Sequence, residues 1–246
     1  MTDDLQKIVT RAYDLFAGYK VTKPLDVCSP HCVTDEEVGQ LVNLNVHHLS
    51  QKLLSTWNHA AKTHHPELSE FKHFLPRFLD LIAQFEWPSH SVELTLKSFG
   101  YYTNSDWTKQ ERQLINEFGG AFFKHCLRTY DLPDVISLDE VIIMLSSAGV
   151  DTEPLLLEWE KSPHEESVRH FADFAIWGAD LKNEFMEQEL RNKMSNWLQK
   201  EGVISNFSKR VEDLILNQQS LDGDDRSHLS WAYEHLQFLP RPHGAG

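Results

Sequence analysis

The chain has 246 residues, of which 41% are hydrophobic and 11% aromatic, enough apolar material for a packed core, so disorder is excluded as the default. The formal net charge of −14 argues against nucleic acid and against an anionic membrane surface as partners. No run of apolar residues reaches the length of a membrane-spanning helix.

The cellular compartment is indicated by the N-terminus and the cysteines. "MTDDLQKIVTRAYDLF" starts acidic and becomes amphipathic, unlike a signal peptide with its basic start and apolar middle. Three cysteines are too few for a disulfide scaffold, and an odd number suits a reducing compartment. We therefore expect a cytoplasmic protein.

Helical periodicity marks the first third of the chain. Apolar residues at spacings of three and four form one stripe from Leu5 to Phe16, which ends near Gly18. Thr34 lies three residues before Glu37, the spacing of a capping box that starts a short helix, and Ser50 can cap the next one. In "FKHFLPRFLDLIAQF", Pro76 predicts a kink, or a break with Pro76 in a new first turn.

Further helices are predicted at about 90–99, 107–129, 138–148, 153–161, 164–178, 182–200, 206–218 and 226–238. Ser137 and Glu140 have capping-box spacing, and Gly149 is placed to end that helix in the left-handed conformation. Pro154 and Pro163 fit first helical turns.

These elements predict an all-α protein of about ten helices in antiparallel pairs, either an α-solenoid-like array or an irregular helical bundle. Residues 72–83 and 169–180 echo one another, which hints at two similar inner helices. We expect an N-terminal half with the cysteine turn (1–130), an acidic C-terminal half continuous with it (131–240), and a frayed tail (241–246).

The stretch "DVCSPHCVTDEEV" is the first candidate for chemistry. Cys28 and Cys32 have a spacing found in zinc sites, with His59 as a further candidate ligand, but no second close pair of ligands accompanies them. Cys32 near a helix start also fits an activated thiol, although no orienting residue is recognisable. We favour a packed turn, and expect no metal or other cofactor.

Two other clusters have structural and functional interpretations. His73 and Arg77 lie four residues apart and can join Asn58 in a buried polar network or a pocket. "LDGDDRS" offers Asp222, Asp224 and Asp225 for magnesium, or a helix cap at Asp224 or Asp225. Phosphate-binding glycine loops and the nucleophile elbow are absent, so we expect no enzymatic activity.

The acidity is concentrated in residues 131–187, where only Lys161, Arg169 and Lys182 oppose a large excess of Asp and Glu. Such a run is often a solvated face, but it also suits a surface that attracts a basic partner. The side chains expected to reach a partner are Asp151, Glu153, Glu158, Glu160, Glu165 and Glu166.

The order "LDVCSPHCVTDEE", "NHAA" and "FKHFLPRFLDLIAQFEWPSHSVELTLKSFG" resembles an uncharacterised family of bacterial all-helical proteins. The later "SVRHFADFAIWGADL" and "NKMSNWLQKEGVISNFSKRVEDLIL" resemble that family's second half. The most specific part is His73-Phe74-Leu75-Pro76-Arg77, whereas the cysteine turn departs from the family because His31 stands where another cysteine is expected.

An acidic, non-enzymatic helical protein of this kind is similar to the immunity proteins that neutralise bacterial toxins. That resemblance implies a basic protein partner, a secreted or injected toxin domain whose active-site surface the acidic region covers. The alternatives are a metal-binding enzyme or zinc-stabilised protein that uses the Cys28/Cys32 turn, and a generic helical scaffold.

Overall fold

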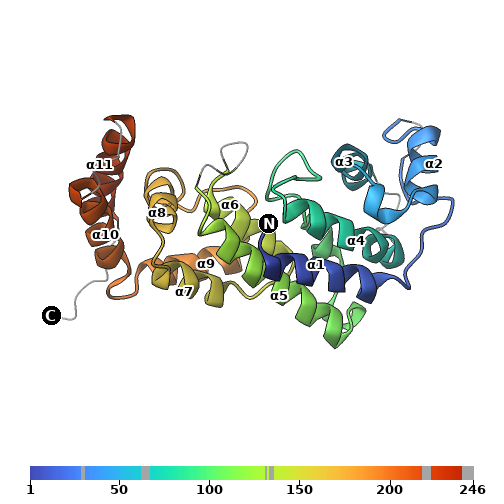
Figure 1. The fold of residues 1–246 in the computed structure, drawn as a ribbon, viewed down its shortest axis with the longest axis horizontal. Helices are drawn as coiled ribbons and strands as arrows, with labels where there is room; N and C mark the ends of the chain where they lie inside the picture. The colour runs from blue at the N-terminus through green and yellow to red at the C-terminus, as the bar shows by residue number, and fades with distance from the viewer. Residues whose placement is uncertain (29–30, 62–66, 131, 133–135, 218–222, 240–246) are drawn as a thin grey trace. The chain divides into compact units, whose positions relative to one another are not determined.

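The computed structural model describes the chain except for residues 29–30, 62–66, 131, 133–135, 218–222 and 240–246. The described residues form eleven α-helices and three short 3-10 helices, with no strand among them, so the predicted all-α class is confirmed (Figure 1). The predicted tail at 241–246 lies outside these residues. Within the same described part, no helix is both long and apolar enough to cross a membrane.

The elements follow one another in this order: α1 (Asp3–Phe16), α2 (Asp35–Asn43), η1 (Val46–His48), α3 (Gln51–His59), α4 (Leu68–Ile82), η2 (Lys97–Tyr101), η3 (Asn104–Asp106), α5 (Lys109–Cys126), α6 (Leu138–Ser147), α7 (Thr152–Lys161), α8 (Glu165–Trp177), α9 (Gln188–Leu198), α10 (Val203–Asn217) and α11 (Gly223–Phe238).

The chain forms two compact units. Unit 1 comprises Met1–Phe122 with Ser147–Val150, and unit 2 comprises Phe123–Ser146 with Asp151–Gly246. These are packing units, and the division of the chain at residue 130 stays a prediction of domain organisation.

Unit 1 is built around α4, which contacts α1, α3 and η1. Trp57 of α3 is fully buried and meets the ring of Phe74 edge-on, with ring centroids 4.8 Å apart. Of the two alternatives predicted at Pro76, a kink or a break, the break is wrong, because α4 continues through Pro76 from Leu68 to Ile82. Pro76 is buried there, so packing outweighs the hydrogen bond that its missing N–H would have made.

Local sequence signals set several helix ends correctly. Thr34 and Glu37 form the predicted capping box, with the Thr34 N–H donating to Glu37 Oε2 at 2.9 Å. Ser50 caps α3 by accepting from the Leu53 N–H, and Gly149 has a φ of +72° just after α6. Each feature satisfies a backbone group that a helix end leaves unpaired, or provides the left-handed residue that ends it.

The predicted helix at 90–99 is wrong. The side-chain amide of Asn58 donates to the carbonyl oxygens of Pro88 and Thr95 at 3.2 and 3.4 Å, and its Oδ1 accepts from Ser98 Oγ at 3.2 Å. Turns and the short η2 replace the helix, and the Asn58 side chain takes up the Thr95 carbonyl oxygen of this segment.

Unit 2 is built around α8, which contacts α10 and α11. Trp159 of α7 is fully buried and meets Phe171 edge-on at 5.6 Å, while Phe171 stacks on Phe207 of α10 at 3.6 Å. Pro163 precedes α8 rather than lying in its first turn.

Helix α9 begins later than the predicted residue 182. Asp180 Oδ1 accepts from the Lys182 N–H and Asn183 Oδ1 accepts from the Phe185 N–H, two local turns that hold the chain outside a helix until Gln188.

The echo between residues 72–83 and 169–180 corresponds to equivalent contacts in the two units. Lys72-His73-Phe74 lies in α4 and Arg169-His170-Phe171 in α8, and both phenylalanines meet the buried tryptophan of a Leu-Leu-x-x-Trp helix. The His73 ring bonds the carbonyl oxygen of Tyr19 at 2.9 Å, as His170 bonds that of Thr129 at 2.9 Å. The two units therefore use the same core interactions.

His170 is the more deeply buried of these histidines, with 2% of its surface exposed. Its Nε2 lies 3.2 Å from the Cys126 carbonyl oxygen in addition to that of Thr129, and since carbonyl oxygens only accept, this nitrogen carries the proton. Burial lowers the pKa of His170 below its ordinary value of 6.5, because the charged ring is poorly solvated.

We expect His170→Gln to make the free energy of unfolding depend less on pH under acidic conditions, because glutamine keeps an N–H donor but does not titrate. As the pH falls below 6.5 the unfolded chain takes up a proton that folded His170 resists, so the free energy of unfolding falls towards pH 5. Urea unfolding between pH 5 and 7 measures the slope. His48→Gln in η1 is the exposed control, and equal slopes for wild type and His170→Gln would contradict the prediction.

Candidate partner-binding site

The six predicted acidic residues lie in one stretch of unit 2, from the cap of α7 to the first turn of α8. Asp151 caps α7 by accepting from the Glu153 N–H at 3.2 Å, and Pro154 lies in the first turn as predicted. Leu155, Leu156 and Trp159 are buried. The opposite side of α7 therefore faces solvent.

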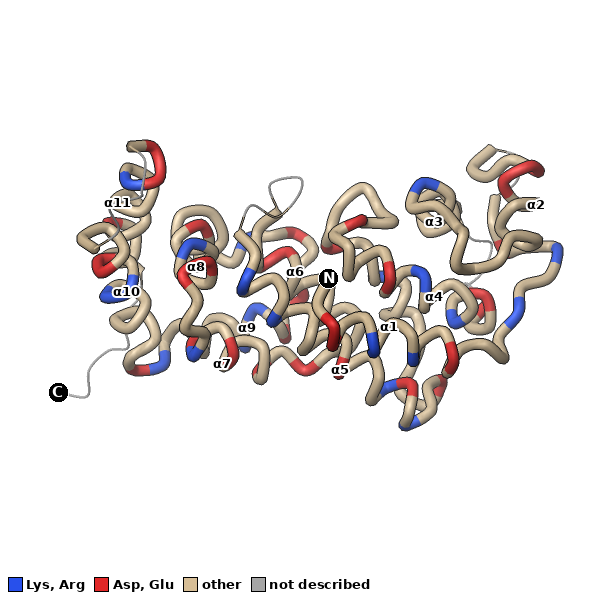
Figure 2. Tube along the Cα trace, viewed as in Figure 1, with Lys and Arg blue, Asp and Glu red and all other residues tan. Residues whose placement is uncertain are grey.

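The exposed side of α7 combines charge with one apolar side chain. Glu153, Leu157 and Glu160 follow one another at spacings of four and three, so they share a helix face, and Leu157 is 46% exposed. Figure 2 marks the acidic positions of α7 and α8 along the chain trace. We call Asp151, Glu153, Glu158, Glu160, Glu165 and Glu166 the α7–α8 acidic face.

The junction between α7 and α8 is fixed from within unit 2 by Arg210 of α10. Its guanidinium donates to the carbonyl oxygens of Glu160 and Ser162 and to Ser167 Oγ, and Trp159 Nε1 donates to the Ser167 carbonyl at 2.9 Å. Burial lowers the pKa of Arg210. The end of α7 and the start of α8 are thus held together, and with them the acidic side chains on both.

Some carboxylates of the acidic face already have cationic neighbours. Glu158 lies 3.4 Å from Lys124, and Glu165 lies 2.9 Å from Arg169. The pKa of Lys193 is raised first by Glu189, with Asp151 and Glu153 adding to the effect. Because an ion pair as exposed as Glu158–Lys124 contributes little to stability, it can be exchanged for a pair with a partner.

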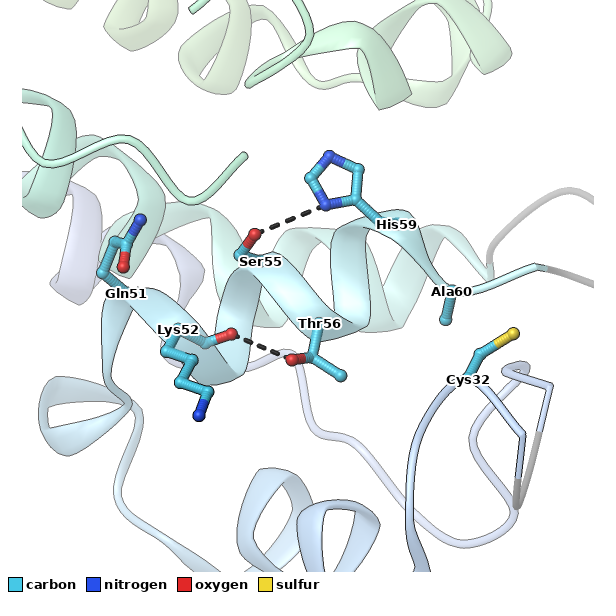
Figure 3. A pocket seen from close by; sticks show the side chains of 7 residues that line it. All are labelled: Cys32, Gln51, Lys52, Ser55, Thr56, His59 and Ala60. Atoms are coloured by element: carbon cyan, nitrogen blue, oxygen red, sulfur yellow. Dashed lines mark hydrogen bonds between the residues drawn. The ribbon is translucent and has the colours of Figure 1, made fainter. Parts of the chain in front are cut away.

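The cysteine turn borders a surface depression of about 360 Å³ in unit 1, lined by Cys32 and residues of α3 and its end (Figure 3). His59 bonds Ser55 Oγ through Nδ1 at 3.3 Å and Ser89 Oγ through Nε2 at 3.1 Å, and its ring stacks on His90. Burial lowers the pKa of His59, and His90 adds to this. Both ring nitrogens of His59 thus make hydrogen bonds with hydroxyl groups.

The turn itself is held by backbone hydrogen bonds. The Cys28 N–H donates to the Ala61 carbonyl oxygen at 2.8 Å, and the Cys32 N–H donates to that of Cys28 at 3.0 Å. A hydrogen bond with the Cys32 thiol, together with burial, raises the pKa of Cys28. Throughout the described residues, no group of three His, Cys, Asp or Glu side chains is arranged to hold a metal ion.

Asn58, His73 and Arg77 each connect a different segment of unit 1. Asn58 holds the 88–98 loop, and His73 holds the carbonyl of Tyr19. Arg77 donates to the Leu49 carbonyl oxygen at 2.8 Å and to Asp80 Oδ2 at 2.6 Å. Their hydrogen bonds thus join α3 and α4 to the surrounding loops at three separate points.

Of the aspartates proposed for magnesium, Asp222 lies outside the described residues. Helix α11 begins at Gly223, so Asp224 and Asp225 lie in its first turn instead of capping it. Asp225 Oδ2 accepts from Arg169 at 2.9 Å, which joins α11 to α8.

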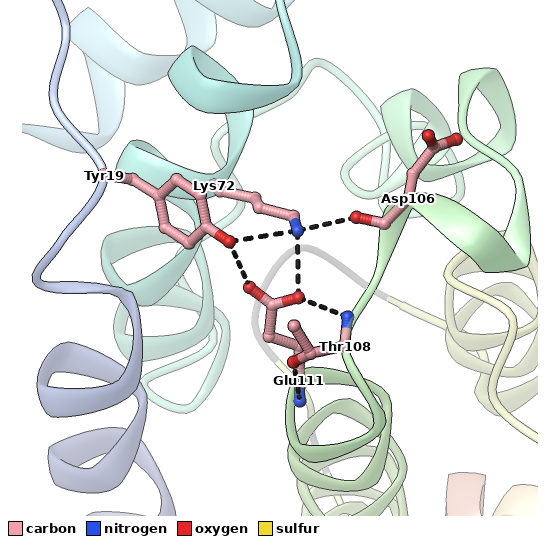
Figure 4. Close-up of polar contacts among 5 residues, drawn as sticks. All are labelled: Tyr19, Lys72, Asp106, Thr108 and Glu111. Atoms are coloured by element: carbon pink, nitrogen blue, oxygen red, sulfur yellow. Dashed lines mark hydrogen bonds and ion pairs between the residues drawn. The ribbon is translucent and has the colours of Figure 1, made fainter.

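Sequence reasoning missed a buried charge cluster in unit 1 (Figure 4). Lys72 Nζ lies 2.9 Å from Glu111 Oε2, and both side chains are 3% exposed. The ammonium also donates to Tyr19 Oη at 3.2 Å and to the Asp106 carbonyl oxygen at 2.7 Å, and Tyr19 donates to Glu111 at 2.7 Å. The ammonium thus has three polar partners, which makes this cluster structural.

One signal pointed to half of this cluster. Thr108 lies three residues before Glu111, and the two form reciprocal hydrogen bonds at the start of α5. Burial alone would raise the pKa of Glu111, but hydrogen bonds from Lys72, the Thr108 N–H and Tyr19 outweigh it and lower the pKa. The lysine gave no signal, since nothing local distinguishes it from a surface residue of α4.

Comparison with models of protein families, with curated proteins and with solved structures found no match to this chain.

We expect Lys72→Met to lower the free energy of unfolding by about 3–5 kcal/mol, because it leaves the Glu111 carboxylate buried without its cation. The double variant Lys72→Met/Glu111→Gln should lose less than the sum of its single variants. Urea unfolding measures both. Lys7→Met, in an exposed pair with Asp4, is the control, and a loss no larger than the control's would overturn the role of the cluster.

The three cysteines should differ in their reaction with a disulfide reagent. Cys32 is exposed and Cys28 half-buried with a raised pKa, so Cys32 should react first and Cys28 more slowly. Cys126 is fully buried and its pKa is raised by that burial, so it should react only after unfolding. Thiol titration with and without urea measures this order, with Cys32→Ser assigning the fast phase. Rapid reaction of all three in the native protein would contradict it.

Proposed function

We propose that this chain is a non-enzymatic binding protein that recognises a basic protein partner through the α7–α8 acidic face. The observation that carries the proposal is the exposed side of α7, where Leu157 lies between Glu153 and Glu160. Carboxylates speed the encounter with a basic surface and select for it, while a central apolar side chain supplies contact area that water leaves on binding.

The mode of action we propose is that of an immunity protein, which neutralises a cognate bacterial toxin by covering its basic active-site surface. Three features support it: the net charge of −14, the acidity between residues 131 and 187, and the resemblance of the chain to bacterial helical proteins. The firm α7–α8 junction supports it as well, since a surface that is already ordered loses little conformational entropy when it binds.

We expect a fourfold charge reversal, Glu153→Lys, Glu158→Lys, Glu160→Lys and Glu166→Lys, to slow association with the basic partner at least about tenfold at low salt. Glu165 is left intact because its pair with Arg169 is largely shielded from solvent, whereas the pair of Glu158 with Lys124 is exposed. The partner to test is the product of the gene immediately upstream, if that product is toxic when expressed alone. Stopped-flow or surface-based kinetics at two salt concentrations measures the rate.

The matched control reverses four exposed acids elsewhere, Glu86, Glu201, Glu212 and Asp213, and changes the net charge equally. It should keep most of the association rate and still restore growth when expressed with the toxin, whereas the acidic-face variant should not. Equal rates for the two variants would show that total charge, rather than this face, governs recognition.

A further inference from the structure

Two tryptophans of unit 2 are exposed as a pair. Trp177, the last residue of α8, is 67% exposed, and Trp231 of α11 is 42% exposed, with their rings perpendicular and 5.2 Å apart. The other five tryptophans are 6% exposed or less. Tryptophan is costly to leave in water and is the residue most enriched where binding energy concentrates.

The pair closes a seam between α8 and α11. Arg169 meets Asp225 at 2.9 Å, Asp173 meets His228 at 2.6 Å one turn on, and Trp177 meets Trp231 one turn further. Two polar contacts therefore link α8 and α11 beside the pair. The ring of His235 lies perpendicular to that of Trp231 at 5.2 Å.

Comparison with unit 1 shows that this position is used differently. If Lys72 is matched with Arg169, then Asp80 of α4 corresponds to Trp177. Asp80 is half-buried and accepts hydrogen bonds from Arg77 and Tyr13 inside its own unit. The shared core interactions thus do not require an exposed aromatic residue here.

An exposed carboxylate follows each tryptophan in the chain. Glu234 lies three residues after Trp231 on the same face of α11, and Asp180 lies in the turn that follows Trp177 at the end of α8. Asp180 pairs with Lys182 at 3.0 Å, but this pair is open to solvent and easily exchanged. An indole face attracts a cation, and a nearby carboxylate adds to the attraction. A second copy of the chain is disfavoured as occupant, since each copy carries a charge of −14.

We propose that Trp177 and Trp231 form a second contact surface, which binds arginine side chains of a basic protein partner between the indole rings and the carboxylates of Asp180 and Glu234. Arginine suits the site better than lysine, because its planar guanidinium stacks on aromatic rings and bonds a carboxylate through two N–H groups. This inference rests on the proposed function in requiring a basic partner, and it concerns residues outside the α7–α8 acidic face.

The probe is a capped hexa-arginine peptide, titrated into the full-length protein and followed through the tryptophan indole N–H signals in NMR spectra. The signals of Trp177 and Trp231, assigned from Trp177→Phe and Trp231→Phe, should shift most. Trp177→Ala and Trp231→Ala should each raise the Kd about threefold and together about tenfold. Capped hexa-lysine should bind more weakly than hexa-arginine.

Tyr101→Ala, which removes a 48% exposed aromatic ring from unit 1, is the matched control and should leave the Kd unchanged. If an alanine variant fails to fold, the phenylalanine variants keep the test valid, since they retain a ring with a weaker attraction for cations and should show a smaller rise in Kd. An unchanged Kd in every tryptophan variant overturns the proposal, as does self-association of the wild type that Trp177→Ala abolishes.

The two proposals fail in different variants. If the tryptophan variants bind like the wild type while reversal of the acidic face slows the partner, the second surface is wrong and the proposed function stands. If the tryptophan variants lose hexa-arginine while reversal of the acidic face has no effect on the partner, the proposed function is wrong at that face and the arginine site stands.

Discussion

Each unit depends on one three-residue run in its central helix, a cation followed by histidine and phenylalanine. In α4 the run is Lys72-His73-Phe74, and in α8 it is Arg169-His170-Phe171. The phenylalanine packs against the tryptophan of another helix, the histidine bonds a main-chain carbonyl oxygen, and the cation pairs with a carboxylate while lying over an aromatic ring. Three successive side chains thus fix three different neighbours to one helix.

The cations of the two runs, Lys72 and Arg169, differ in how far they are exposed to solvent. Lys72 is buried, and its ammonium group contacts Glu111, Tyr19 and a backbone carbonyl oxygen, so its charge serves only the fold. Arg169 is partly exposed and bridges Glu165 of its own helix and Asp225 of α11. Unit 2 therefore keeps ionised groups at its surface, where α8 joins the acidic face at one end and the exposed tryptophans at the other.

The fold was predictable from the sequence wherever local chemistry decides. The apolar stripe of α1, the capping box of α2 and the stop at Gly149 were identified correctly because each acts within a few residues. The 90–99 segment was not, because its Thr95 carbonyl oxygen accepts a hydrogen bond from Asn58, which lies 37 residues earlier in the chain. Pro76 shows the same limit, since burial in unit 1 maintains a helix that local preference would end.

For the candidate site, the sequence located the acidic residues but gave no sign of the Arg210 contacts or of the Trp177–Trp231 pair. These contacts join residues 43 to 54 positions apart in the chain.

The acidic residues of unit 2 are better placed to meet a partner than the side chains at the cysteine turn. Cys28, Cys32 and His59 are accounted for by hydrogen bonds to neighbouring groups, and so are Asn58, His73 and Arg77. In α7, by contrast, the fold uses the inner side chains and the cap, while Glu153 and Leu157 are exposed and Glu158 makes one exposed ion pair with Lys124. Acidic groups gathered at this density repel one another and weaken the fold that carries them. A basic partner would relieve that repulsion on binding, so the same electrostatic cost that the free protein bears becomes part of the driving force for recognition.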